Sequence, residues 1–271
     1  MRIFPKVFCI PLLVLGFIFP LRAQRPFLFT ESPNTVGDGK LSVGLGVEYL
    51  KKEKAIPPNA PIELLKIPAV RTYVGLGEIV DVLIDWRGRL LAEQGTGTRV
   101  ADWGDISLGT KINFLKEGKS APSLGVMYVV KLPNTSHDEL LGSNQTDFFV
   151  SFLAAKQFPG IQVRANLGLG ILDDPEHAHS QLDIYTMSTA LILAVGREHS
   201  FFVEWAGFLG SHSDQAKFTA RAGIEGTFVG AEWTAFGSCR VIGDEKDFGT
   251  AFEYSESWGV GLFVRKVLSL W

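Results

Sequence analysis

Residues 103–133 read WGDISLGTKINFLKEGKSAPSLGVMYVVKLP and hold two runs in which apolar and polar residues alternate. In the first run Leu108 takes an apolar position and Lys111 a polar one, and in the second Val130 is followed by Lys131. A strand points successive side chains to opposite faces, so each run has one apolar and one polar face. The polar KEGKSA between them predicts a hairpin. Each strand has about the 9–11 residues that a tilted strand needs to cross a bilayer.

The same alternation recurs along the rest of the chain. We predict twelve strands, an even number as in bacterial single-chain barrels. They cover residues 40–49, 69–77, 79–90, 105–114, 123–132, 147–158, 160–172, 181–195, 200–208, 217–227, 229–240 and 253 to the end.

The connections between these strands alternate in length. Short ones lie at residues 77–78, 116–121, 159–160, 196–199 and 228–229, and long ones at 51–61, 92–102, 134–145, 173–180, 210–216 and 242–251. Outer-membrane barrels have short periplasmic turns and longer external loops. A soluble β-sandwich is the alternative, but it has no reason to keep this alternation. The sequence therefore predicts an all-β fold, a closed antiparallel transmembrane barrel.

The first 23 residues resemble a secretory signal. Arg2 and Lys6 precede an apolar run over residues 7–19, and Ala23 supplies a small residue for cleavage. A retained anchor is the alternative, but the apolar run is shorter than the roughly 20 residues of a spanning helix. We expect a signal peptide at 1–23, an extended N-terminal leader at 24–38 and the barrel at 39–271, in the outer membrane of a Gram-negative cell.

Removing the signal takes three basic residues and no acidic one. The remaining 23 Lys and Arg against 29 Asp and Glu give a net charge of about −6. This excess of acidic over basic residues argues against nucleic acid as a partner, because phosphate binding needs a basic surface. Cys9 leaves with the signal, and Cys239 then has no intramolecular disulfide partner. We expect no cofactor.

The charged residues of the strands fall on the face opposite the apolar one, which in a barrel is the lumen. Twelve strands lie between filled eight-stranded barrels and open porins of about 16–18 strands, so we expect a narrow, partly filled pore. The charges could form a salt-bridge network or a polar path for solutes. We predict the following lumen-lining residues: Glu48, Arg71, Asp81, Asp85, Arg87, Arg89, Asp105, Lys111, Lys131, Arg164, Glu204, Lys217, Arg221, Glu225 and Glu232.

The longest connection, residues 134–145, carries a capping-box pattern from Ser136 to Glu139. A short helix there needs a surface to pack on, and the barrel mouth is the nearest one. We predict a gate loop, and the alternative is a mobile surface loop. The residues assigned to it are Asn134, His137, Leu140 and Leu141.

Two loops carry residue types found at metal or catalytic sites. Residues 173–179 include His177 and His179 among acids, and residues 211–214 read SHSD around His212. A divalent cation site and a hydrolytic triad are the functional interpretations. A solvated polar loop is the structural interpretation, and neighbours in sequence do not by themselves converge in space. We therefore predict no metal and no catalytic residue.

Six stretches resemble the family known as the MetA-pathway of phenol degradation. They are TESPNTVGDG at 30–39, GDISLGTKINFLKEG at 104–118, VKLPN at 130–134, LGSNQTDFFVSFLAAKQF at 141–158, ANLGLGIL at 165–172, and GVGLFVRK in the last strand. The resemblance implies an outer-membrane barrel with a role in transport and no catalytic residues. Family members end soon after the arginine matching Arg265, whereas this chain continues to Trp271. Trp271 would be the terminal aromatic that the barrel-insertion machinery reads.

We expect this barrel to let small solutes, aromatic or amphipathic, cross the outer membrane by passive or facilitated diffusion. The expected partners are the lipid bilayer, the insertion machinery and a solute that the sequence does not name. Two alternatives remain open. One is an outer-membrane enzyme of the lipid deacylase or protease type, and the other is a non-conducting barrel with a structural or adhesive role.

Overall fold

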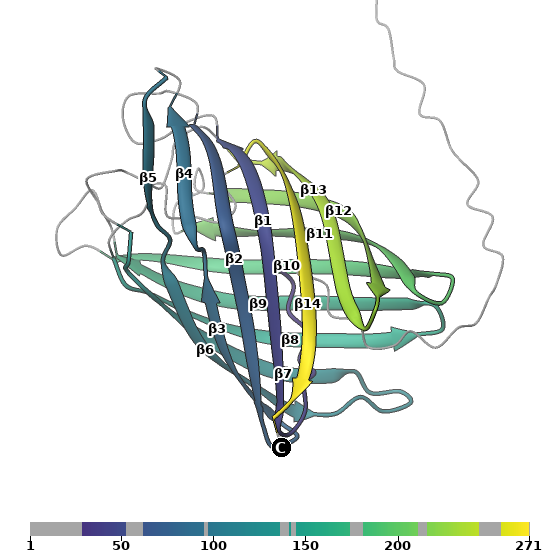
Figure 1. Ribbon diagram of the computed structural model, residues 1–271. Coiled ribbons are helices and arrows are strands. Elements are labelled where there is room, and N and C mark those ends of the chain that lie inside the picture. The colour runs from purple at the N-terminus through teal and green to yellow at the C-terminus, as the bar shows by residue number, and fades with distance from the viewer. Residues whose placement is uncertain are drawn as a thin grey trace, which may run out of the picture.

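The computed structural model describes residues 29–52, 62–94, 97–135, 141, 145–173, 181–210, 216–243 and 256–270. They form one antiparallel sheet that curves into a barrel (Figure 1). Its strands are β1 (Lys40–Lys52), β2 (Ile62–Leu76), β3 (Val80–Trp86), β4 (Arg89–Gln94), β5 (Arg99–Trp103), β6 (Ile106–Leu115), β7 (Ser123–Leu132), β8 (Asp147–Phe158), β9 (Ile161–Asp173), β10 (Gln181–Val195), β11 (His199–Gly210), β12 (Ala216–Phe228), β13 (Ala231–Ile242) and β14 (Trp258–Ser269).

The barrel closes because β1 pairs with both β2 and β14. β3 and β4 both pair with β2, so they are two halves of one spanning strand. In the same way β6 pairs with β3, and β5 pairs with β4. The 14 segments of the sheet thus make twelve spanning strands, and the predicted twelve-stranded antiparallel barrel is confirmed. In the last strand, β14, Trp258 lies opposite Lys51 of β1 and Ser269 lies opposite Lys40.

The third spanning strand is interrupted between β3 and β4, where the sequence predicted one continuous run. Gly88 has a φ of +64°, and a Cβ on it would lie 1.8 Å from the carbonyl oxygen of Pro68. Pro68 has no amide to donate to the ladder. The neighbouring strand is interrupted at the same level, between β5 and β6, where the Gly104 amide donates to the Gly88 carbonyl at 2.7 Å. Beyond the break both strands continue through β4 and β5, into residues predicted to be a loop.

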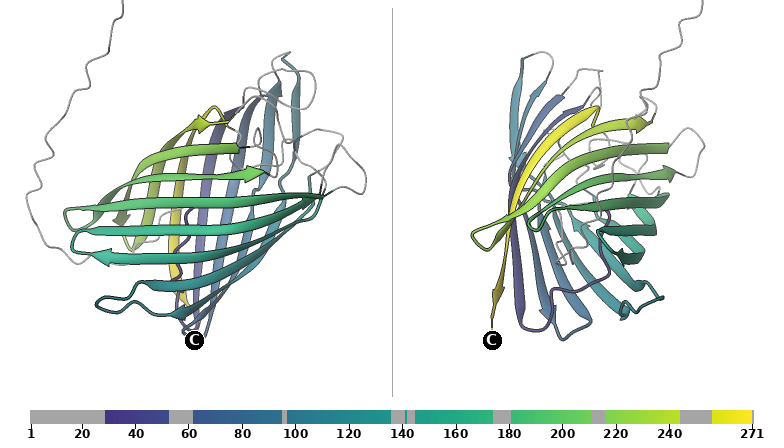
Figure 2. Two further views of the ribbon diagram at one scale, coloured as in Figure 1. Left: turned by 180° about the vertical axis from the view of Figure 1, so that it is seen from behind. Right: turned by 90° about the vertical axis from the view of Figure 1, so that its right-hand side faces the viewer.

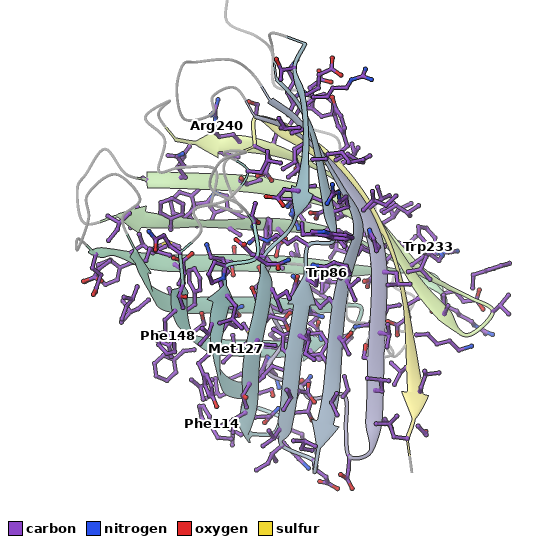
Figure 3. The ribbon with its side chains drawn as sticks, turned by 60° about the vertical axis from the view of Figure 1, so that its left-hand side comes forward. Trp86, Phe114, Met127, Phe148, Trp233 and Arg240 are labelled. Carbon is purple, nitrogen blue, oxygen red and sulfur yellow. The ribbon has the colours of Figure 1, made fainter. Side chains whose placement is uncertain are left out.

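The outer face of the barrel is apolar. Leu108 is 43% exposed, Phe152 67% and Leu167 63%, and each alternates with an inward-facing residue. Phe114, Phe148 and Trp233 likewise project outward from the wall (Figure 3). A surface of this kind is stable in lipid and would be costly in water. Among the described residues, no helix is long and apolar enough to span a membrane.

The two ends of the barrel differ. The turn at residues 77–79 lies beside the start of β1 and the end of β14, since Leu41 pairs with Val74 and Lys40 with Ser269. The turns at 159–160 and 229–230 are equally tight and lie at this end as well. By the rule that short turns are periplasmic, this end faces the periplasm.

The interior is not uniformly polar. Strands β1–β3 and β8–β10 form opposite walls of the barrel (Figure 2). Between the walls, a buried apolar cluster fills part of the space and consists of Ala69, Ala190, Ile192, Phe202, Phe236 and Phe263. These inward-facing aromatic rings narrow the lumen along β11, β13 and β14.

Candidate functional site

Residues 29–39, here called the N-terminal segment, lie inside the barrel. Thr30 is 0% exposed and Ser32 4%. The segment enters from the end with the short turns, where the Gly77 amide donates to Asp38 at 2.9 Å and the Thr35 hydroxyl donates to the Glu78 carbonyl at 2.8 Å. The sequence predicted an extended leader here but did not place it in the lumen.

The barrel wall is shaped to receive this segment. A Cβ on Gly75 would lie 1.9 Å from the carbonyl oxygen of Gly37, so only glycine allows this approach of the two backbones. Further in, the Val36 amide donates to both oxygens of Asp81, at 2.9 and 3.1 Å. On β7, two strands along the sheet from β3, the Ser123 hydroxyl donates to the Asn34 side chain at 2.8 Å. The segment is thus anchored to strands β2, β3 and β7.

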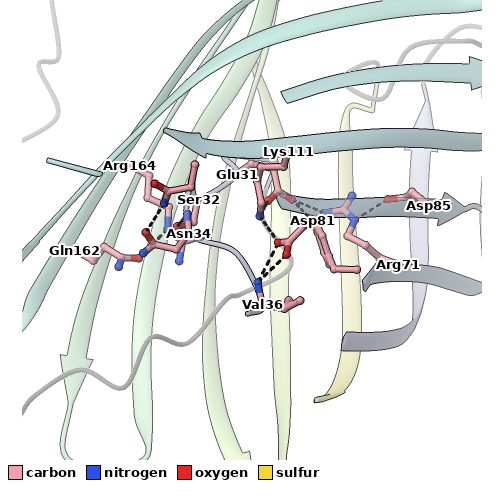
Figure 4. A network of polar contacts seen from close by, with 12 residues as sticks. Glu31, Ser32, Asn34, Val36, Arg71, Asp81, Asp85, Lys111, Gln162 and Arg164 are labelled. Carbon is pink, nitrogen blue, oxygen red and sulfur yellow. Dashed lines mark hydrogen bonds and ion pairs between the residues drawn. The ribbon is translucent and has the colours of Figure 1, made fainter. Parts of the chain in front are cut away.

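Glu31 is the charged centre of the contact between the N-terminal segment and the barrel wall (Figure 4). Its Oε1 lies 3.6 Å from Nη1 of Arg71 and accepts a hydrogen bond from the Tyr73 hydroxyl, and its Oε2 lies 3.6 Å from Nζ of Lys111. Burial acts against the ionised form, but the charges of Lys111 and Arg71 outweigh it, so the pKa of Glu31 lies below its ordinary value.

Both cations that contact Glu31 also contact a carboxylate of the wall. Lys111 Nζ lies 3.4 Å from Asp81 Oδ2, and Arg71 Nε lies 2.6 Å from Asp85 Oδ2. Lys111 is 1% exposed, so this network is deeply buried. Buried charges persist only when they are paired in this way.

The far end of the described segment reaches the opposite wall. The Thr30 amide donates to the carboxylate of Glu204, and the guanidinium of Arg221 lies 3.2 Å from the centroid of the Phe29 ring. The segment therefore crosses the lumen from the periplasmic turns to strands β11 and β12.

A cavity of about 180 Å³ remains beside the segment inside the barrel. Phe29 and Glu31 of the segment form part of its lining. The wall contributes apolar and charged side chains, among them Leu83, Met127, Phe149, Ile184, Met187, Arg71, Asp85, Arg87, Lys131 and Asp147. A cavity with both kinds of lining suits an amphipathic molecule.

Most of the residues predicted to line the lumen lie with buried side chains inside the barrel. The buried ones are Glu48, Asp81, Asp105, Lys111, Lys131, Arg164, Glu204, Lys217, Arg221 and Glu225. Four are partly exposed on the inner face: Arg71, Asp85, Arg87 and Glu232. Their charges are mixed and many are paired, as in the ion pair of Glu232 with Arg265.

Arg89 departs from the predicted placement. It pairs in register with Ile67 and Trp103, which are 44% and 48% exposed, and its guanidinium lies 4.9 Å from the centroid of the Trp103 ring. The break at Gly88 shifts the alternation by one residue, so Leu90 turns inward and Arg89 outward. The assignment of Arg89 to the lumen is therefore wrong.

Four residues of the predicted gate loop are described: Asn134, Thr135, Leu141 and Gln145. Asp105 Oδ1 accepts the amides of Asn134 and Thr135 at 3.0 and 3.1 Å. Leu141 is 6% exposed and packs into an apolar cluster with Leu50, Leu64, Leu90 and Ala92. These contacts attach the loop to Asp105, just before β6, on one side and to β1, β2 and β4 on the other. His137, Leu140 and the terminal Trp271 lie outside the described residues.

Several buried charges were missed by the sequence analysis. Lys66 lies 3.1 Å from Glu48, and it precedes the point where the second strand was predicted to begin. Asp147 lies 2.5 Å from Lys131 and was counted only as a strand boundary. Glu256, just before β14, is 0% exposed, and neither of its carboxylate oxygens has a hydrogen-bond partner. Burial raises the pKa of Glu256.

The part of the chain that the structure describes contains no group of three or more His, Cys, Asp or Glu residues placed to hold a metal ion. The histidine-bearing stretches considered above, with His177, His179 and His212, lie outside the described residues.

Comparisons with known proteins agree with this architecture. The COG4313 outer membrane channel from Pseudomonas putida F1 superposes with a TM-score of 0.68 at 12% identity, over 89% of this chain and 100% of that one. The translocator domain of the autotransporter NalP from Neisseria meningitidis gives 0.52 at 10% identity, over 85% of this chain and 88% of that one. At these identities the likeness shows the fold. No curated protein matches the sequence.

The barrel fold, its apolar outer face and the outer-membrane barrels that it resembles place the protein in the outer membrane, as predicted. A family model described as "Putative MetA-pathway of phenol degradation" matches residues 26–228, which include the N-terminal segment and most of the strands. This chain belongs to that family, as the sequence motifs indicated.

Proposed function

We propose that this barrel passes small aromatic or amphipathic solutes across the outer membrane by passive or facilitated diffusion, and that the N-terminal segment sets the narrowest part of the route. The observation that carries the proposal is the cavity of about 180 Å³ between the segment and the wall. It is lined by apolar and charged side chains together. The COG4313 protein from Pseudomonas putida F1, whose structure superposes on this barrel, is an outer membrane channel, and this likeness supports the proposal.

The arrangement favours amphipathic over purely hydrophilic solutes. A hydrophilic solute exchanges contacts with water for contacts with side chains that are already paired, and it gains little. A solute with an apolar body gains from leaving water for the surfaces of Met127, Phe149 and Met187. The paired charges of the wall can still solvate its polar end.

Liposome swelling tests this proposal. Phenylalanine is an amphipathic solute that crosses bilayers poorly, and arabinose is a smaller and wholly polar one. We expect liposomes that contain the barrel to swell in phenylalanine at least as fast as in arabinose. A plain aqueous pore would instead favour the smaller arabinose, and a non-conducting structural or adhesive barrel would admit neither solute.

The enzyme alternative makes a different prediction. An outer-membrane hydrolase that relies on the loop histidines would lose activity when His177, His179 or His212 is replaced by alanine. A channel of the proposed kind would keep its solute flux in all three variants. Hydrolase activity and solute flux, measured side by side in these variants, therefore separate the two functions.

A further inference from the structure

We propose that the donors holding Glu31 form a binding site for the carboxylate of a solute, and that Glu31 occupies this site as an internal stand-in. The donors are Arg71, Tyr73 and Lys111, here called the carboxylate site. The inference rests on the proposed function, because it names the chemical class of the solute: a monocarboxylate with an apolar body.

The geometry of the site matches a carboxylate. Oε1 of Glu31 receives the Tyr73 hydroxyl and lies 3.6 Å from Arg71 Nη1, while Oε2 lies 3.6 Å from Lys111 Nζ. Each oxygen of the carboxylate therefore faces its own cation. Donors fixed around both oxygens of a planar acceptor recognise a carboxylate by shape as well as by charge.

The site keeps its shape without Glu31, because the wall supports both cations. Lys111 retains Asp81 at 3.4 Å, and Arg71 retains Asp85 at 2.6 Å. Lys111 also lies over the Tyr73 ring, 4.8 Å from its centroid. A preorganised site loses less conformational entropy when its ligand binds. Asp81 and Asp85 also repel a second negative charge nearby, so a monoanion fits better than a phosphate dianion.

The space next to the site suits an apolar body. Arg71 and Glu31 both line the cavity of about 180 Å³, whose apolar lining includes Leu83, Met127 and Phe149. A solute whose carboxylate replaces that of Glu31 would therefore place its hydrocarbon part in this cavity. When Glu31 leaves, buried donors lose an acceptor, and an incoming carboxylate restores it.

The test uses the full-length barrel in nanodiscs, with calorimetric titration against empty discs. The probes are 4-phenylbutyrate, its neutral counterpart 4-phenylbutanol and the cation 4-phenylbutylamine. Glu31→Ala empties the site, and Glu78→Ala is the matched control because it removes an exposed carboxylate that pairs with Lys116. Heat-modifiable migration on a gel confirms that each variant is folded.

We expect Glu31→Ala to bind 4-phenylbutyrate at least about tenfold more tightly than wild type and than the Glu78→Ala control. The alcohol and the amine should gain no such preference. Adding Tyr73→Phe to Glu31→Ala removes one donor without changing the shape of the site. It should weaken binding of the acid several-fold and leave the alcohol unchanged.

Equal affinity of Glu31→Ala for the acid and the alcohol would overturn the proposal. An affinity for the acid that stays the same when Tyr73→Phe is added would overturn it too. The outcome is separable from that of the proposed function. Acid-selective binding without solute flux would support the site and contradict passage, whereas flux without acid-selective binding would contradict the site alone.

Discussion

The carboxylate of Asp81 accepts the backbone amide of Val36 through both of its oxygens, at 2.9 and 3.1 Å, and so ties the N-terminal segment to strand β3. The same carboxylate lies 3.4 Å from Lys111, which also contacts Glu31 of the segment. One wall residue therefore contacts both the backbone of the segment and the cation that holds its charge. The chain carries its own occupant of the lumen, held by buried polar contacts.

Asp81→Asn should loosen the segment. The amide keeps the shape of the side chain but loses the charge, and a hydrogen bond to a charged group is worth about 1.5–3 kcal/mol. We expect arabinose-driven liposome swelling to become faster than in wild type. Glu93→Gln is the control, because Glu93 pairs with Arg99 on the exposed outer part of the barrel. Equal swelling of all three proteins would show that the segment is not held by Asp81.

Leu108→Arg should block insertion, whereas Ser107→Arg should not. Leu108 is 43% exposed on the outer face, while Ser107 lines the lumen cavity one residue away. Arginine facing lipid near the midplane costs about 2–4 kcal/mol. At position 107 it would enter a cavity that contains Asp85 and Asp147. Heat-modifiable migration reports the folded fraction, and equal tolerance of both changes would contradict the facing of β6.

Leu141→Asp should detach the loop between β7 and β8 from the barrel mouth. Leu141 is 6% exposed against Leu50, Leu64 and Leu90. A carboxylate cannot be buried there without a partner. We propose that this loop restricts the external opening, so the variant should raise antibiotic uptake by cells at an unchanged level of folded barrel. Leu141→Met conserves the volume and should leave uptake unchanged. Unchanged uptake in Leu141→Asp would contradict a restricting role for this loop and would place the constriction inside the lumen.

Glu256→Gln should stabilise the barrel at pH 8 but not at pH 4. Burial raises the pKa of Glu256 in the folded state, so ionisation above the unfolded pKa counts against folding. Glutamine removes this cost. At pH 4 the wild-type carboxyl is largely protonated in the folded state, and the difference shrinks. Guanidinium unfolding in detergent micelles at both pH values measures the effect. A gain of equal size at the two pH values would point to packing rather than charge.

The sequence predicts the barrel well because lipid imposes a strict rule on it. A charge on the outer face is costly. The alternation of outward apolar residues such as Leu108 with inward polar ones such as Lys111 therefore predicts where the strands lie and which face of each points to lipid. The same rule fails where the backbone leaves the regular ladder. Gly88 and Pro68 shift the alternation, and Arg89 turns outward with no signal in the hydrophobic pattern.

Only the part of the candidate site that lies on the barrel wall could be predicted from the sequence. The wall charges Arg71, Asp81 and Lys111 follow from strand parity, but their partner Glu31 lies in a stretch with no alternation. Contacts of that kind are set by three-dimensional proximity across distant parts of the chain. The glycine at position 75 was a weak sequence signal, since it marks where another backbone approaches closely.

Single-channel recording in planar bilayers tests the central claim most directly. Wild type is compared with a variant in which residues 29–36 are replaced by a Gly-Ser linker of equal length, with folding confirmed by heat-modifiable migration. We predict a small conductance for wild type and a clearly larger one for the variant, because the segment no longer fills the lumen. Equal conductance in the two proteins, or none in either, would contradict the claim that the N-terminal segment sets the narrowest part of a conducting route.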